Sequence, residues 1–146
     1  MTVQSEPRRY LSAEDVEAAF YDALARADLE ALMEVWSDDE EVVCIAADGT
    51  RAVGLPAVRA YWQRLFDAQA GQRLQVTRHI ATLSVTMAFH HITEEVAPQA
   101  SAPPQRRAVS LLYVRGALGW RLALYHVSPT PDPAVRATTD QVRVVH

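Results

Sequence analysis

Residues 54–66 read GLPAVRAYWQRLF and carry the strongest helical pattern in the chain. Apolar side chains recur there at spacings of one, three and four residues, which places them on one stripe of a helix: Val58, Tyr61, Trp62, Leu65 and Phe66. Gly54-Leu55-Pro56 opens this helix, because proline is tolerated in a helix's first turn. The pattern predicts a helix that buries its stripe against another layer.

Two further helices are predicted before this segment. Ser12 to Asp15 fits a capping box ahead of an apolar stripe, so a helix is expected over residues 13–27. Asp28 can cap a second helix. The acidic run at residues 38–41 opposes a helix dipole at its C-terminal end, so this helix should end near Trp36 or Ser37. The run itself is interpreted as a solvated turn rather than a metal site.

The remainder of the chain has the character of strands. A short strand is expected at residues 42–46, before the turn Asp48-Gly49, and four longer ones at about 72–80, 83–96, 106–115 and 119–128. Prolines forbid regular pairing between residues 97 and 105 and end the domain after Ser128. Residues 141–145 could add an edge strand.

Helices followed by a run of antiparallel strands indicate an α+β fold. We expect the helices to pack on one face of a twisted sheet of four to five strands, leaving a concave mouth for a ligand. The predicted organisation is an N-terminal arm (1–10), one domain (11–131) and a C-terminal tail (132–146).

Composition excludes several classes of function. The chain has 146 residues, 49% of them apolar, and a net charge of −4, which suits one soluble domain and not a general nucleic-acid binder. No apolar run is long enough to span a membrane, and no signal peptide is expected at the N-terminus. The single cysteine is compatible with a cytoplasmic location. All 14 basic residues are arginines, so chemistry that needs a lysine amine, including a pyridoxal phosphate Schiff base or a Walker A loop, is excluded.

Three segments resemble a known family. Residues 18–44 (AAFYDALARADLEALMEVWSDDEEVVC), residues 54–66, and residues 119–129 (GWRLALYHVSP) are similar to NTF2-like proteins of the SnoaL-like group, and the resemblance covers residues 10–131. It implies a cone formed by three N-terminal helices on a curved, mainly antiparallel sheet. It also implies a homodimer formed through the outer face of the sheet. It does not select one activity, because this fold hosts isomerases, dehydratases and non-catalytic modules.

The chain departs from the ketosteroid-isomerase-like members where their catalytic groups lie. Cys44 stands at the position of their aspartate base, and Phe20 near that of their tyrosine, with Tyr21 adjacent. Cys44 is interpreted as a buried small apolar residue. These differences favour binding over isomerase chemistry.

His126 is the leading candidate for acid/base chemistry. It alternates with Trp120, Leu122 and Leu124, so all four are expected on the inward face of the last strand, with Arg121 and Tyr125 facing away. An imidazole exchanges protons near neutral pH. The alternative is a half-buried structural histidine that bonds Ser128 or a helix residue and fixes the end of the strand. Tyr21 is the expected catalytic partner, and Tyr21, Asp22 and the strand histidines loosely resemble a dehydratase set.

His90 and His91 resemble a metal pair, but adjacent strand residues project to opposite faces. His79 with Glu94 or Glu95 would have to complete the site, and no spacing enforces that convergence. We predict neither a metal nor a cofactor.

The expected pocket is apolar with a few polar points, which suits a flat hydrophobic molecule. Its predicted lining is Phe20, Trp36, Tyr61, Trp62, Phe66, Phe89, His91, Tyr113 and Trp120. The sequence therefore favours a small-molecule-binding protein with no nucleic-acid or membrane partner, and the family resemblance implies that it forms a homodimer. An acid/base lyase or isomerase acting on a cyclic substrate, and a non-catalytic interaction module, remain as alternatives.

Overall fold

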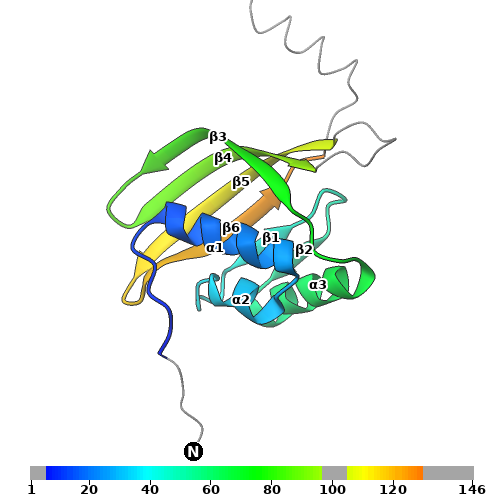
Figure 1. The fold of residues 1–146 in the computed structure, drawn as a ribbon. Coiled ribbons are helices and arrows are strands. Elements are labelled where there is room, and N and C mark those ends of the chain that lie inside the picture. Colours follow the sequence, from blue (N-terminus) through cyan, green and yellow to red (C-terminus); the bar gives the residue numbers. More distant parts are fainter. Residues whose placement is uncertain (1–5, 97–104, 130–146) are drawn as a thin grey trace, which may run out of the picture.

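The computed structural model of the chain describes residues 6–96 and 105–129. Its helices are α1 (Ala13–Arg26), α2 (Leu29–Glu34) and α3 (Leu55–Ala68). Its strands are β1 (Val43–Ile45), β2 (Arg51–Val53), β3 (Leu74–Leu83), β4 (Met87–Val96), β5 (Gln105–Gly116) and β6 (Gly119–Val127). These strands form one sheet in the order β2-β1-β6-β5-β4-β3, and among them the β1–β6 pairing is parallel and the other four are antiparallel (Figure 1). The predicted α+β fold is confirmed.

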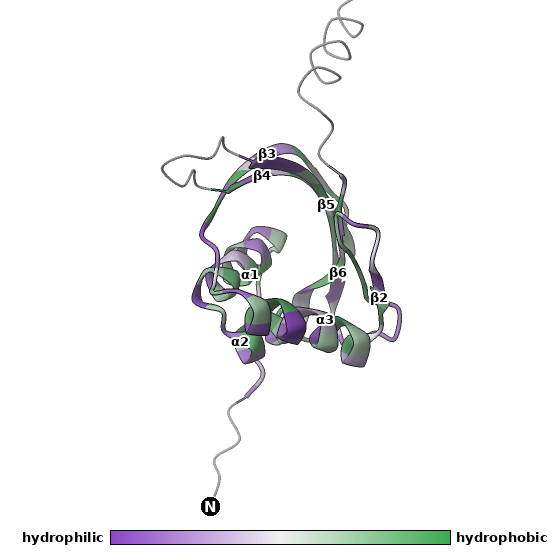
Figure 2. Ribbon diagram, turned by 90° about the vertical axis from the view of Figure 1, so that its right-hand side faces the viewer, coloured by the Kyte–Doolittle hydropathy of each residue, from purple (hydrophilic) through white to green (hydrophobic). Residues whose placement is uncertain are grey.

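The sheet curves over the helices, which all lie on its concave side (Figure 2). The core forms where α1 and α3 meet β6. There the ring of Phe20 packs against Trp62 and Tyr125 at centroid distances of 5.7 and 5.2 Å. These three residues belong to the apolar stripes or to the inward face of the last strand, so burial of aromatic surface holds the two layers together.

The helix limits follow from local capping. The Ser12 hydroxyl accepts a hydrogen bond from the Asp15 amide at 3.1 Å and begins α1. Ala27 ends it in the left-handed conformation at φ 51°, and the Asp28 amide returns to the Ala23 carbonyl at 3.0 Å. The Asp28 side chain then accepts from the Ala31 amide at 3.1 Å and starts α2. The predicted helix starts are confirmed.

The strand limits needed two corrections. β2 was not predicted, because three residues between a turn and Gly54 carry no periodicity. The turn between β3 and β4 lies at residues 84–86 and not at 81–82, because the Ser84 hydroxyl supplies it by bonding both the amide and the carbonyl of Met87. No glycine or proline marks this turn in the sequence.

A β-bulge in β6 changes which side chains face inward. Leu112 pairs with Leu124, but Tyr113 pairs with Leu122, so Ala123 is an extra residue. Beyond this bulge Tyr125 and Val127 are buried, and His126 is exposed on the convex face. The predicted inward orientation of His126 and outward orientation of Tyr125 were therefore wrong, because strict alternation was counted through a bulge.

The chain before α1 also packs onto the domain. Tyr10 is buried, and its carbonyl accepts a hydrogen bond from the Trp120 amide at 2.9 Å. This approach requires glycine at position 119, which has φ +87° and where a Cβ atom would lie 2.4 Å from the Tyr10 oxygen. In the described residues, no helix has the length and apolar character that crossing a membrane requires. The loop expected between residues 97 and 105 and the edge strand expected at 141–145 fall largely or wholly outside the described residues.

Candidate functional site

Two carboxylates are buried between α1 and the concave face of the sheet. Glu17 comes from the second turn of α1 and is 5% exposed, and Glu94 comes from β4 and is 0% exposed. Burying an ionised carboxylate is costly unless other groups compensate its charge. The structure supplies each with an arginine and at least one tyrosine.

Glu17 accepts hydrogen bonds from three directions. Its Oε2 contacts His90 Nδ1 and accepts from the Tyr113 hydroxyl at 2.9 Å. Its Oε1 accepts from Arg78 Nη2 at 3.0 Å. The four residues come from α1, β3, β4 and β5, so this carboxylate ties the helix to three neighbouring strands.

Glu94 has an equivalent set of donors. The hydroxyls of Tyr21 and Tyr125 donate to its Oε2 at 2.6 and 2.7 Å. Arg107 Nη2 donates to its Oε1 at 3.0 Å. The helix therefore carries an acid for the first cluster and a tyrosine for the second, one turn apart.

The three tyrosines of these clusters are held in their protonated form. Burial, followed by repulsion from the charge of Glu94, raises the pKa of Tyr21 and of Tyr125 well above 10. Burial and the charge of Glu17 raise the pKa of Tyr113 in the same direction. The hydroxyls therefore act as hydrogen-bond donors at neutral pH.

His90 connects the Glu17 cluster to the molecular surface. Its Nδ1 is engaged by Glu17, and its Nε2 lies 3.6 Å from Oε1 of Glu14, one turn earlier on α1. The His90 side chain is only 2% exposed, whereas that of Glu14 is 55% exposed. A carboxylate on Nδ1 fixes the orientation of the ring and leaves Nε2 for proton exchange. Glu14 thus stands between His90 and solvent.

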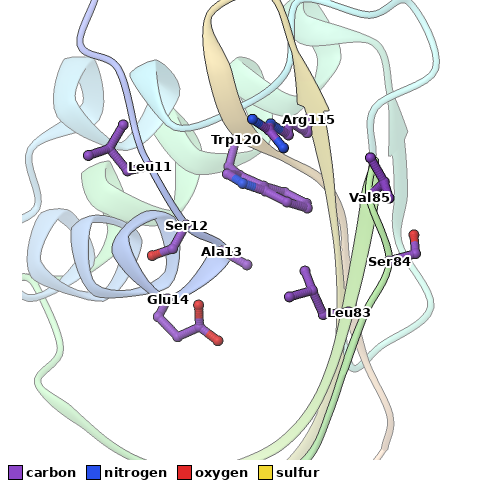
Figure 3. A pocket seen from close by; sticks show the side chains of 9 residues that line it. All are labelled: Leu11, Ser12, Ala13, Glu14, Leu83, Ser84, Val85, Arg115 and Trp120. Carbon is purple, nitrogen blue, oxygen red and sulfur yellow. The ribbon is translucent and has the colours of Figure 1, made fainter.

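Glu14 also lines a cavity of about 490 Å³ at this end of the cone. The lining comes from the start of α1, the β3–β4 turn and the β5–β6 hairpin: Leu11, Ser12, Ala13, Glu14, Leu83, Ser84, Val85, Arg115 and Trp120. Figure 3 shows Glu14 on the α1 side and Arg115 on the hairpin side beside Trp120. The cavity is mostly apolar, and Glu14 joins it to the buried cluster.

The structure distributes most of the predicted site residues over several places on the concave side. Tyr21 and Tyr113 belong to the carboxylate clusters, and Trp120 lines the cavity. Four others pack in or against the core: Phe20, Tyr61, Trp62 and Phe66. Trp36 is buried and lines a second hollow of about 430 Å³.

Other predicted residues lie away from this site. Phe89 and His91 alternate with buried residues of β4 and face the convex side, as His126 does on β6. The predicted pocket lining by Phe89 and His91 was therefore wrong. The error arose from the alternation of β4, in which His90 points inward and His91 points outward.

Sequence reasoning missed the buried carboxylates, although signals for them exist. Ala88, His90, Ile92 and Glu94 alternate on β4, so parity alone places all four on one face. Glu17 lies one turn before Tyr21 and next to the apolar stripe. Arg78 carries no such signal, because a register shift at His79 interrupts the alternation of β3.

Cys44 has the buried apolar role that was predicted. It is 1% exposed, and burial raises the pKa of its thiol to about 12. It therefore remains a protonated thiol at neutral pH.

Comparison with solved structures supports the fold. A candidate calcium/calmodulin-dependent protein kinase type II association domain from Thiobacillus denitrificans is 31% identical, with a TM-score of 0.79 over 86% of this chain and 100% of its own. A candidate dehydratase of the NTF2-like family from Streptomyces avermitilis is 22% identical, with a TM-score of 0.69 over 80% of this chain and 93% of its own. A ketosteroid isomerase-like protein from Erwinia carotovora atroseptica is also 22% identical, with a TM-score of 0.63 over 82% of this chain and 94% of its own.

At these identities the last two likenesses establish the fold alone. No curated protein matches the chain. Residues 13–133 match the model of the SnoaL-like domain, which covers most of the chain. The chain is therefore a member of the SnoaL-like domain family, with the NTF2-like fold.

Proposed function

We propose that this protein binds a small, mostly apolar molecule in the cavity and exchanges a proton with it through Glu14. One observation carries the proposal: Glu14 lines the cavity and its Oε1 lies 3.6 Å from His90 Nε2, while Glu17 holds the opposite ring nitrogen. The cavity volume of about 490 Å³ lies within the usual range for small-molecule sites.

The array Glu14–His90–Glu17 has the parts of an acid/base relay. Glu14 can take a proton from a bound molecule, and His90 Nε2 can share it, because Glu17 stabilises the imidazolium that forms. Returning the proton to another atom of the molecule gives an isomerisation, and returning it to a leaving hydroxide gives a dehydration. A candidate dehydratase and a ketosteroid isomerase-like protein share this fold, so the proposed reaction class is one that the fold can host.

The first test is native mass spectrometry of protein purified without denaturation, which reports a retained molecule directly. A ligand identified in this way, or by screening cyclic carbonyl compounds, is then measured against Glu14→Gln and His90→Gln. His126→Gln is the matched control, because this histidine is exposed on the convex face.

We expect turnover to fall at least about 100-fold in the first two variants and to be unchanged in the control. Because His90 is buried, thermal unfolding must show that its variant is folded. If His90→Gln does not fold, Glu14→Gln alone tests the relay, because Glu14 is half exposed and its replacement should not disturb folding. Full turnover in folded Glu14→Gln would overturn the relay.

We also propose that the protein forms a homodimer through the convex face of the sheet. Three large apolar side chains are exposed there: Ile80 (49%), Met87 (44%) and Phe89 (36%). The three are neighbours, because Ile80 pairs with His91, the next residue on that face after Phe89. Contiguous exposed apolar side chains mark association surfaces. The description of the Thiobacillus protein as an association domain favours a role in assembly.

Sedimentation tests this proposal, since the chain mass is 16.2 kDa. We expect a species of twice that mass and its dissociation in Phe89→Asp. Val85→Asp should leave it intact, because Val85 lies at the cavity mouth and is 78% exposed. A monomer at high micromolar concentration would contradict the proposal.

A further inference from the structure

We infer that the cavity selects a molecule with a cyclic apolar body and one carboxylate, and that Arg115 binds this carboxylate. The inference rests on the proposed function of the cavity as a ligand site. It adds the chemical class of the ligand and the orientation in which it binds.

Arg115 is a cation on a mostly apolar wall. Among the residues that the structure describes, no carboxylate forms an ion pair with its guanidinium group. Arg78 and Arg107, which also lie on the sheet, each bind a buried glutamate instead. A guanidinium presents a planar fork of donors that matches a carboxylate in two parallel hydrogen bonds.

The surroundings of Arg115 favour an apolar ligand body. Leu11, Leu83 and Val85 border the cavity at exposures of 78%, 73% and 78%. The Trp120 ring stands beside Arg115 and offers a flat wall (Figure 3). Covering these side chains would remove apolar surface from water, which favours binding. An apolar ring with one anionic group therefore matches both features of the lining.

The charges of the cavity also determine one orientation. Glu14 and Arg115 lie on opposite sides of it (Figure 3). A ligand carboxylate is attracted to Arg115 and repelled by Glu14. The carboxylate therefore lies on the hairpin side, and the opposite end of the ligand faces Glu14 and His90. The atom that exchanges a proton is consequently remote from the carboxylate.

The alternative hypothesis is a cationic ligand bound by Glu14. Glu14 already has His90 as a polar neighbour, with 3.6 Å between its Oε1 and His90 Nε2, whereas no carboxylate forms an ion pair with Arg115 among the described residues. Arg115 is therefore the charged group of the lining that has no ion-pair partner among the described residues, which favours an anion.

Calorimetry with naphthoate and its neutral isostere naphthamide tests the inference, at low salt and about pH 8, where the acid is ionised. We expect wild-type protein to bind naphthoate at least about five times more tightly than naphthamide. Arg115→Gln should abolish this preference while keeping affinity for the amide. Arg73→Gln is the charge-matched control, because Arg73 is exposed just before β3, at the end opposite Leu83.

Each other outcome has a distinct meaning. Equal affinity of wild-type protein for both compounds would overturn the carboxylate preference but leave the cavity as a ligand site. A preference that survives Arg115→Gln would overturn the role of Arg115. Binding of neither compound at millimolar concentration would contradict the inference and would count against the proposed ligand site as well.

Discussion

Raising the pH above about 10 should destabilise this protein through its buried tyrosines. The folded state holds the pKa of Tyr21, Tyr113 and Tyr125 well above the unfolded value of 10. Below that value both states are protonated, and the tyrosines add no pH dependence. Above it the unfolded chain releases protons that the folded chain retains, so the free energy of unfolding falls as the pH rises.

The magnitude follows from linkage. At about pH 11 each tyrosine with a strongly raised pKa costs about 1.4 kcal/mol, so the three together cost about 4 kcal/mol. The Cys44 thiol, whose pKa is raised to about 12, has an effect of the same sign. These losses are a large part of the total stability of about 5–15 kcal/mol expected for a domain.

Urea unfolding at about pH 8 and about pH 11, on wild type and Tyr21→Phe, isolates one tyrosine. The variant loses a hydrogen bond to Glu94 and should be less stable at the lower pH. The stability deficit of the variant relative to wild type should be smaller by about 1.4 kcal/mol at the higher pH, because the variant has no hydroxyl to ionise at this position. Ile92→Val is a core control without a titratable group. A deficit for Tyr21→Phe that does not change with pH would refute the reasoning.

Three further predictions concern stability. Gly119→Ala should cost about 2–3 kcal/mol in urea unfolding, because alanine would be strained at φ +87° and its Cβ would meet the Tyr10 oxygen. Ala27→Gly should raise the melting temperature by about 2–4 °C, because it relieves a left-handed alanine; a lower value would show that lost side-chain contacts outweigh this gain. Glu94→Gln should cost about 2–4 kcal/mol, because it leaves the charge of Arg107 without its carboxylate, whereas Glu95→Gln on the outer face should change stability by less than about 1 kcal/mol.

The helical half of the fold could be predicted because its signals are local. The stripe that includes Val58 and Trp62, and the caps at Ser12 and Asp28, depend only on neighbours within one or two turns. The strands were found by composition, and their ends were less certain because the β3–β4 turn uses Ser84 rather than glycine or proline. The overall architecture followed from the order of these elements.

The site was harder to predict because it depends on which strand face points inward. That choice reverses with a single extra residue. Ala123 is such a residue in β6, and it exchanged the predicted places of Tyr125 and His126. On β4, where no bulge intervenes, correct parity would have placed His90 and Glu94 inside. The alternation of the strands therefore indicated which residues share a face, but the sequence did not show which face points inward.

The two buried carboxylates differ in the groups that they connect, and this difference distinguishes a structural role for Glu94 from a role in proton exchange for Glu17. Ion pairs buried in this way add little stability compared with apolar packing, so retaining one calls for another reason. Glu94 binds only groups within the cone, and its two tyrosines and Arg107 hold α1 to β5 and β6. Glu17 instead orients His90 toward Glu14, which borders the cavity. Replacing Glu94 should therefore reduce stability without a specific effect on proton exchange, whereas replacing Glu17 should impair both.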